Sequence, residues 1–189
     1  INIVGNVRTI DKVIRREMAL VEGDAFNTSK MRTSRRRIQN LQFFDRVEVT
    51  NVPGEAADRT VVNVEVNEKS TGELSFGIGF SSADGPLLDA SIRERNLLGR
   101  GQDLRVGGTL SARRNQIDVG FTSPYFLDRN MTAGFDAFHV KRDFQREAGY
   151  DYISTGLILR NNYNLSEYLK QQVRYTLKND DIAGVNYYA

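Results

Sequence analysis

The sequence contains no cysteine and a single histidine, His139. Without cysteine, the chain has neither a disulfide framework nor thiolate ligands for zinc. One histidine alone does not make a metal site, because such a site needs several ligands. A Ser-His-Asp triad would have to use His139, and no Gly-x-Ser-x-Gly motif accompanies it. We therefore expect no metal, no cofactor and no catalytic residues, and we expect that the protein is not an enzyme.

The sequence also has little net charge and no long apolar segment. The net charge of +2 is too small for a nucleic-acid-binding protein. No run of about 18 apolar residues exists, which excludes a transmembrane helix but not a membrane barrel, whose strands are only half apolar. Gly77 and Gly79 do not form a phosphate-binding fingerprint, because the third glycine and the following helix are missing. No signal peptide is visible, so we expect an exported protein to be an internal or processed fragment.

The pattern of the chain changes at Gly72. Before this residue, apolar positions recur at helical spacing between short alternating segments, and after it only short alternating segments follow. The stretch 72–82 sets the new pattern, because its large apolar residues share one face and its small polar residues share the other. A strand of a soluble sandwich shows the same alternation. Many such strands in series, with only three prolines in the chain, favour a membrane barrel.

Residues 1–71 read as a small α+β domain. The pattern predicts a strand at 1–4, a helix capped by Thr9 and ended by Gly23, a second helix capped by Thr28 or Ser29, and two strands. The order β-α-α-β-β places two helices on one face of a small mixed sheet. The apolar positions predict a core that contains Val13, Ile14, Ile38, Leu41, Val62 and Val64.

Residues 72–189 predict about seven antiparallel strands of about ten residues, joined by polar turns, which is the pattern of a transmembrane β-barrel. Seven strands cannot close a membrane pore, because bacterial single-chain barrels have an even number of strands and no open edge in lipid. We therefore predict the N-terminal portion of a larger barrel. The side predicted to face lipid contains Leu74, Phe76, Ile78, Phe80, Leu104, Val106, Val119, Phe121, Leu157 and Leu159.

Four sets of short motifs lie along the chain. They are IVGN at 3–6 with DKVIRRE at 11–17, NLQFFDRV at 40–47, NEKSTG at 67–72 with FGIGF at 76–80, and NLLGRG at 96–101 with SPYF at 123–126. Their order and spacing resemble the BamA family of outer-membrane β-barrel assembly factors. The resemblance covers essentially the whole chain, as the last POTRA domain (1–71) followed by the first part of the barrel (72–189).

The resemblance implies a protein that folds and inserts β-barrel proteins into the outer membrane, without a nucleotide, by templated strand pairing. In this family the seam between the first and last barrel strands opens sideways, and the first strand pairs with an incoming strand. An unpaired edge offers the backbone donors and acceptors for this, and glycines remove side-chain barriers. The alternative is that the glycines only relieve crowding inside a barrel. The gate residues would be Leu74, Ser75, Phe76, Gly77, Ile78, Gly79 and Phe80.

The resemblance also implies a location and partners. The location is the bacterial outer membrane, with the POTRA domain in the periplasm. The partners are nascent outer-membrane proteins, accessory assembly lipoproteins and outer-membrane lipid, and no nucleic acid. From the residues themselves, Arg32, Arg35 and Arg36 share one helix face, which predicts contact with an acidic partner or with anionic lipid headgroups. A solvated helix face is the alternative.

Three other functions are alternatives to outer-membrane assembly. A sister member of the same superfamily, which secretes polypeptides or assembles autotransporters, shares the POTRA–barrel junction and is the main alternative. A passive porin predicts no POTRA domain, so residues 1–71 argue against it. An outer-membrane phospholipase would need a nucleophile paired with a histidine, and the sequence contains no such constellation.

Overall fold

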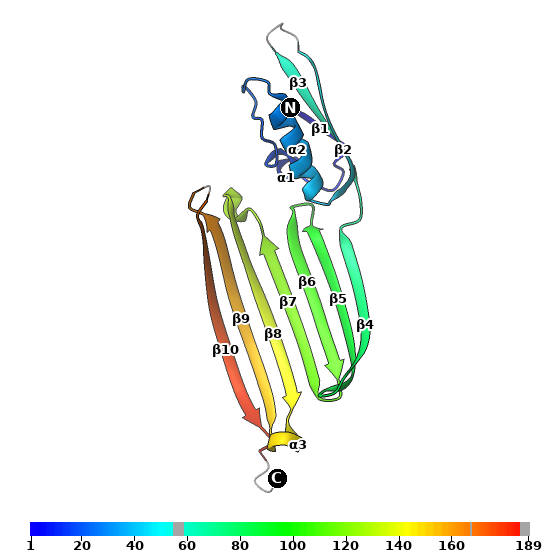
Figure 1. Ribbon diagram of the computed structural model, residues 1–189, viewed down its shortest axis with the longest axis vertical. Coiled ribbons are helices and arrows are strands. Elements are labelled where there is room, and N and C mark those ends of the chain that lie inside the picture. Colours follow the sequence, from blue (N-terminus) through cyan, green and yellow to red (C-terminus); the bar gives the residue numbers. More distant parts are fainter. Residues whose placement is uncertain (55–58, 167, 186–189) are drawn as a thin grey trace. The chain divides into compact units, whose positions relative to one another are not determined.

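The computed structural model of the protein describes residues 1–54, 59–166 and 168–185. The chain divides into two compact units (Figure 1). The first unit comprises Ile1–Thr71 together with Arg95–Gly101, and the second comprises Gly72–Glu94 and the chain from Gln102 onward. An α+β unit is thus followed by a seven-stranded antiparallel sheet, which confirms the predicted fold class.

The first unit has the predicted order of helices and strands. Its elements are β1 (Asn2–Val4), α1 (Asp11–Arg15), α2 (Thr28–Asn40), β2 (Phe44–Pro53) and β3 (Thr60–Glu68). The sheet order is β1-β3-β2, with β1 parallel and β2 antiparallel to the central strand β3. No helix among the described residues is long and apolar enough to cross a membrane.

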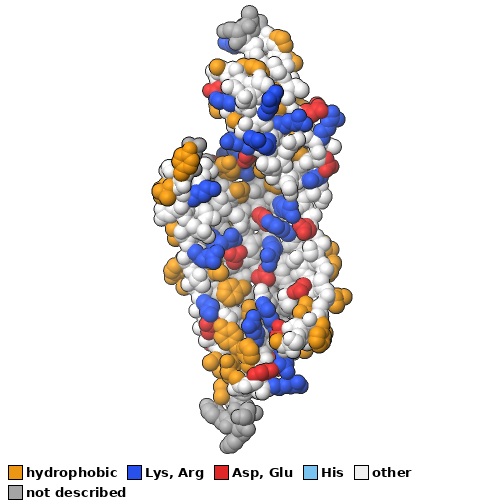
Figure 2. Space-filling view, viewed as in Figure 1, with side chains coloured by type: hydrophobic (Ala, Val, Ile, Leu, Met, Phe, Trp, Pro, Cys, Tyr) orange, Lys and Arg blue, Asp and Glu red, His pale blue; other side chains and the backbone are white. Residues whose placement is uncertain are grey.

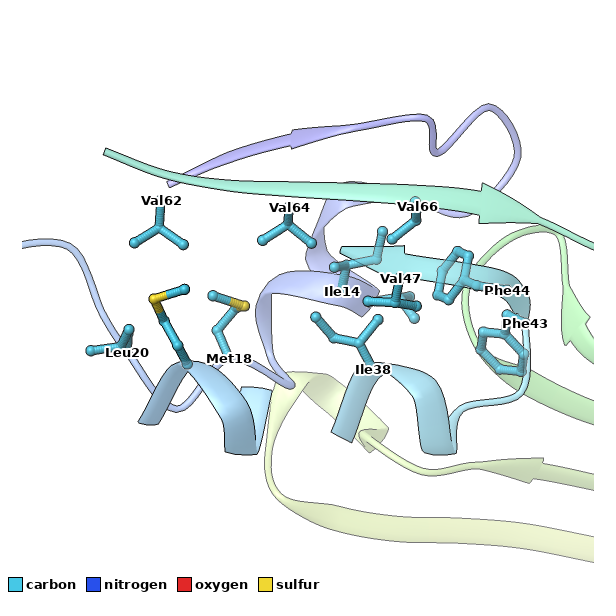
Figure 3. Close-up of a cluster of buried hydrophobic side chains, with 12 residues drawn as sticks. Ile14, Met18, Leu20, Ile38, Phe43, Phe44, Val47, Val62, Val64 and Val66 are labelled. Atoms are coloured by element: carbon cyan, nitrogen blue, oxygen red, sulfur yellow. The ribbon is translucent and has the colours of Figure 1, made fainter. Parts of the chain in front are cut away.

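The core of the first unit lies between this sheet and the two helices. Val62, Val64 and Val66 alternate along β3, and all three are buried on the side where Ile14 and Ile38 lie (Figure 3). The apolar side chains that alternate on β3 therefore pack against the apolar side chains that recur at helical spacing on α1 and α2. Five of the six predicted core residues are buried. The sixth, Leu41, is partly buried and packs against the same cluster.

Helix α1 is shorter than predicted. Val13, Ile14 and Met18 are buried, as their spacing predicts, but the helix ends at Arg15 and not at Gly23. Beyond the helix, the Glu17 and Met18 amides make tighter turns to the Ile14 and Arg15 carbonyls, and the Ala19 amide donates to Ser34 Oγ at 2.8 Å. The Ser34 hydroxyl in turn donates to the Lys30 carbonyl at 2.8 Å, so this buried hydroxyl accepts one hydrogen bond and donates another.

The helix caps also differ from the predicted ones. Thr9 does not cap α1: the N-cap is Ile10, and the Thr9 hydroxyl instead accepts a hydrogen bond from Asn96 Nδ2 at 2.9 Å. Helix α2 is capped by Asn27, whose side-chain oxygen accepts from the amides of Ser29 and Lys30 at 2.8 and 3.1 Å. Asparagine is among the best N-cap residues because its side chain satisfies amides that have no partner within the helix.

The segment Arg95–Gly101 packs into the first unit, although it is distant from that unit in the sequence. The Ile10 amide donates to the Gly99 carbonyl at 3.0 Å, and Asn96 Oδ1 accepts from the Gly101 amide at 2.7 Å. Gly99 has a φ of +70°, and a Cβ on it would lie 1.9 Å from the Arg8 carbonyl oxygen. Only glycine fits this close approach at positive φ. The glycine in this turn is therefore a packing requirement of the first unit.

Glu68, at the end of β3, has a buried carboxylate that binds the segment before α1. It accepts hydrogen bonds from the amides of Arg8 at 2.9 Å and Thr9 at 2.7 Å, and its side chain is 8% exposed. Burial alone would raise the pKa of Glu68. The hydrogen bonds from the Thr9 side chain and from the two amides, together with the Arg8 charge, outweigh burial and hold the pKa below its ordinary value.

This shift predicts a pH dependence of stability. A carboxylate whose pKa is depressed in the folded state stabilises the fold above its unfolded pKa of about 4.3, and this contribution is lost as the pH falls through the lower folded value. We expect Glu68→Gln to be less stable than wild type at pH 7, and we expect the difference to shrink below about pH 4. Unfolding of the first unit, followed by hydrogen exchange on β3 against pH, checks this. A difference that does not change with pH would contradict the assignment.

The second unit is an up-and-down sheet in which sequence neighbours are also sheet neighbours, in the order β10-β9-β8-β7-β6-β5-β4 (Figure 1). Each strand overlaps one of the seven predicted strands, and several are longer than predicted. One helical turn lies between β7 and β8 and another between β8 and β9. The elements are β4 (Gly72–Ser81), β5 (Gly85–Leu97), β6 (Gln102–Ser111), β7 (Arg114–Ser123), η1 (Phe126–Asp128), β8 (Met131–Asp143), α3 (Gln145–Ala148), β9 (Asp151–Asn164) and β10 (Lys170–Ala183).

Candidate functional site

Strand β4 forms one edge of the seven-stranded sheet. In the described part of the chain it pairs with β5 alone, in a continuous antiparallel register from Gly72–Glu94 to Ser81–Gly85. Along such a strand, every second residue directs its backbone N–H and C=O away from the neighbour. The outer side of β4 therefore presents a row of backbone donors and acceptors that another strand can pair with.

The seven predicted gate residues lie together on β4 and divide between its two faces. On one face the large apolar side chains are all exposed: Leu74 62%, Phe76 72%, Ile78 90% and Phe80 80%. The opposite face carries only Ser75, Gly77 and Gly79 between Glu73 and Ser81. Apolar side chains exposed to this extent mark a surface that contacts another protein or lipid.

The two glycines of β4 differ in how much room they have. A Cβ on Gly79 would lie 3.1 Å from Leu87 Cδ1, which is a tight contact. A Cβ on Gly77 would meet nothing closer than Asp89 Cβ at 3.7 Å, which is ordinary packing distance. Crowding against Leu87 therefore explains a glycine at position 79, whereas no such close contact explains the one at position 77, which lies within the predicted gate segment.

The apolar face continues across the sheet in register. Phe121 on β7 pairs with Leu104 on β6 and with Phe135 on β8, and Phe135 pairs with Leu159 on β9. The rings of Phe121 and Phe135 lie 5.8 Å apart. In the next row, Val119 pairs with Val106 and Ala137. These rows make one wall of apolar side chains, as the predicted lipid-facing set requires.

An arginine in this wall is expected to destabilise the folded barrel in a bilayer. We expect Val106→Arg to cost about 2–4 kcal/mol, because the charge would enter hydrocarbon near the middle of β6. Thr109→Arg on the same strand is the matched control: it points to the other face, beside Asp89, with which Thr109 now makes a hydrogen bond. We expect a much smaller cost there. Urea unfolding of the full-length protein in phospholipid vesicles measures both, and equal costs would mean that the sheet is not a membrane wall.

Charged side chains line the opposite face of the sheet, where blue and red groups lie side by side over its middle (Figure 2). Partly exposed pairs like these add little to stability, so their main effect is to keep this face polar and hydrated. A sheet with one apolar and one hydrated face has the cross-section of a membrane barrel wall. The pairs join neighbouring strands: Arg93–Asp103 at 3.0 Å, Arg105–Asp118 at 2.8 Å and Arg160–Asp136 at 2.7 Å.

Glycines on this polar face lie directly opposite aspartates. Gly107 pairs with Asp118 across β6 and β7, and Gly120 pairs with Asp136 across β7 and β8. A Cβ on Gly120 would lie 2.9 Å from Asp136 Oδ1, and one on Gly107 would lie 3.2 Å from Asp118 Oδ2. Because each glycine has no side chain, it leaves room for the aspartate carboxylate opposite it. An arginine on a neighbouring strand binds that carboxylate.

The three predicted arginines lie in the first unit. Arg32, Arg35 and Arg36 are exposed on α2, and within the described residues no hydrogen bond or ion pair is present for their side chains. His139 lies on β8, and its Nδ1 is 2.7 Å from Thr155 Oγ1. In the described ranges no cluster of three or more histidine, aspartate or glutamate side chains is arranged to hold a metal ion.

Two family descriptions match the chain. Residues 1–69 match POTRA, described as a surface antigen variable number repeat. Residues 96–189 match the Omp85 superfamily domain. The two matches follow one another in the order of the two units.

Curated relatives match most of the chain. The outer membrane protein assembly factor BamA of Neorickettsia risticii is 35% identical over 187 residues, which is 98% of this chain and 25% of that protein. BamA of Neisseria meningitidis is 30% identical over 173 residues, which is 89% of this chain and 22% of that protein. The chain therefore spans a quarter or less of the length of these relatives.

Solved structures share the fold. The crystal structure of BamA from Haemophilus ducreyi lacking POTRA domains 1–3 superposes with a TM-score of 0.85 at 24% identity, covering 97% of this chain and 35% of that one. CdiB from Escherichia coli superposes with a TM-score of 0.63 at 15% identity, covering 97% of this chain and 37% of that one. At these identities the likeness is one of fold.

Proposed function

Because the chain belongs to the BamA family of the Omp85 superfamily, we propose that it is part of a protein that folds and inserts β-barrel proteins into the bacterial outer membrane. The named members of this family are assembly factors and not enzymes. We further propose that assembly proceeds by templated strand pairing on β4. As the chain covers only part of its relatives, the activity is proposed for the complete protein.

The observation that carries this proposal is the pattern of side chains on β4, with exposed apolar side chains on one face and Ser75, Gly77 and Gly79 on the other. A client strand that adds to the outer side of β4 forms backbone hydrogen bonds that lipid cannot supply. The alternating faces of β4 match those of a barrel strand, which has one apolar and one polar side. A client strand in register would therefore extend the apolar wall and the hydrated face together.

The free energy for such a step would come from apolar burial and from the closure of unpaired edges. Client side chains that leave water for the wall beside Phe76 and Ile78 bury apolar area, and every added strand satisfies backbone groups that lipid cannot. No nucleotide enters this scheme. The exposed apolar face of β4 supports it, because the side chains that would meet the client are already in place.

The remaining partners and the location belong to the same proposal. We propose the outer membrane for the sheet and the periplasm for the POTRA domain, with nascent outer-membrane proteins as clients. Accessory lipoproteins and outer-membrane lipid are proposed as further partners. The family of the curated relatives supports each of these assignments.

A sister protein that secretes polypeptides or assembles autotransporters is the alternative function. Reconstitution of the complete protein in lipid vesicles separates the two. We expect an unfolded client barrel protein to become protease-resistant and folded in the vesicle membrane, faster than in empty vesicles. Transfer of a soluble polypeptide into the vesicle lumen, with no gain in client folding, would assign the sister function instead.

A further inference from the structure

Helix α2 concentrates positive charge on its exposed side. Between Thr28 and Asn40 it carries no acidic residue and five basic ones, Lys30, Arg32, Arg35, Arg36 and Arg37. Subtracting these five from the 26 basic residues leaves 21, against 24 acidic residues in the whole chain. The net charge of +2 therefore originates in this one helix.

Several other basic side chains of the first unit form ion pairs with neighbouring acids. Arg15 pairs with Asp11 at 3.0 Å, and Lys30, at the start of α2, pairs with Asp24 at 3.0 Å. Arg32, Arg35 and Arg36 have no such acid among the described residues. Arg32 lies three positions before Arg35 and four before Arg36, so its charge faces theirs across one turn and the like charges repel. An anionic partner would relieve this repulsion.

The composition of α2 favours a protein over a membrane as that partner. Helices that lie on membranes place apolar side chains in the bilayer beside their basic residues. The apolar residues of α2, Met31 and Ile38, are buried in the core instead. The exposed side offers guanidinium groups and, one turn further on, the amide of Gln39. Guanidinium groups form paired hydrogen bonds with carboxylates, and an amide can bind a backbone group.

We propose that Arg32, Arg35 and Arg36 form a docking surface for an acidic protein segment whose carboxylates recur at helical spacing. The proposal does not depend on strand pairing at β4. It concerns the recruitment of a partner by the first unit, and either proposal can fail without the other.

The test uses the full-length protein in phosphatidylcholine nanodiscs and a fluorescent helical peptide with glutamates every third and fourth residue. We expect binding, measured by fluorescence anisotropy, to weaken about tenfold in Arg32→Gln/Arg35→Gln/Arg36→Gln, because charge-assisted hydrogen bonds are lost. The matched control, Lys12→Gln/Arg46→Gln/Arg59→Gln, removes three exposed positive charges outside α2 and should bind like wild type. Added salt should weaken wild-type binding by screening. Unchanged thermal unfolding would show that both variants fold.

Three results would overturn the proposal. Equal losses in the two triple variants would mean that net charge alone attracts the peptide. Flotation of the nanodiscs with phosphatidylglycerol vesicles, lost in the α2 variant and without peptide binding, would assign the surface to lipid. Binding of neither probe by the wild-type protein would leave α2 with a solvated face.

Discussion

Proline at position 78 is expected to reduce client assembly by the complete protein about tenfold or more, which corresponds to about 1.4 kcal/mol in the barrier. Valine at the same position should leave assembly near the wild-type rate. Proline removes a backbone donor and cannot sit in a paired strand, whereas valine keeps the backbone intact and is favoured in strands. The folding rate of a client barrel in vesicles that contain each variant measures the effect.

Neighbouring positions separate templating from a damaged sheet. The N–H groups of Gly77 and Ile78 point to opposite sides of β4, one toward β5 and the other away from it. Of Gly77→Pro and Ile78→Pro, we expect one to lower the stability of the sheet, and the other to lower assembly while the melting temperature stays unchanged. Full assembly activity in both variants would place the client site elsewhere.

The second large effect concerns the core of the first unit. Ile14 is 0% exposed and lies among the buried side chains of α1, α2 and β3. Ile14→Asp would place an unpaired charge there, and we expect it to cost about 3–5 kcal/mol, enough to unfold a marginally stable domain. Loss of hydrogen-exchange protection along β3 in the full-length protein measures this.

Ile10→Asp is the matched control for that change. Ile10 is 43% exposed and occupies the N-cap of α1, where aspartate is a favoured residue. We expect the control to be neutral or slightly stabilising. Similar losses of protection in both variants would contradict the assignment of the core. We also propose that residues 1–71 fold alone, and a disordered circular dichroism spectrum of the isolated segment would count against that.

Most features of the fold that the sequence predicts follow from the periodicity of its apolar residues. A period of two placed Val62, Val64 and Val66 on one side of β3, and the same period separated Phe76 from Gly77 on β4. Such patterns lie within one strand, so they can be identified in the sequence without any knowledge of the neighbouring strands. The gate residues could be proposed for the same reason, with the family resemblance supplying their role.

Contacts between distant segments could not be predicted. The Ala19 amide beyond α1 donates to Ser34, and the Thr9 hydroxyl accepts from Asn96, so both groups bind residues that are distant in the sequence. Gly107 and Asp118 lie opposite each other because of the register between β6 and β7. The alternation of side chains within each strand does not determine that register. The NLLGRG motif and its two glycines marked the turn at 96–101, but they did not identify the surface against which it packs.

The most direct test of the account is site-specific crosslinking between β4 and a stalled client barrel. The 189 residues of this chain contain no cysteine, so single cysteines placed at successive positions from Leu74 to Phe80 have no competing thiol in this part of the full-length protein. Templated strand pairing predicts crosslinks to the terminal strand of the client that are strong at every second position, because ladder pairing repeats every two residues. Crosslinks that form only from cysteines in the first unit, with none from β4, would contradict it.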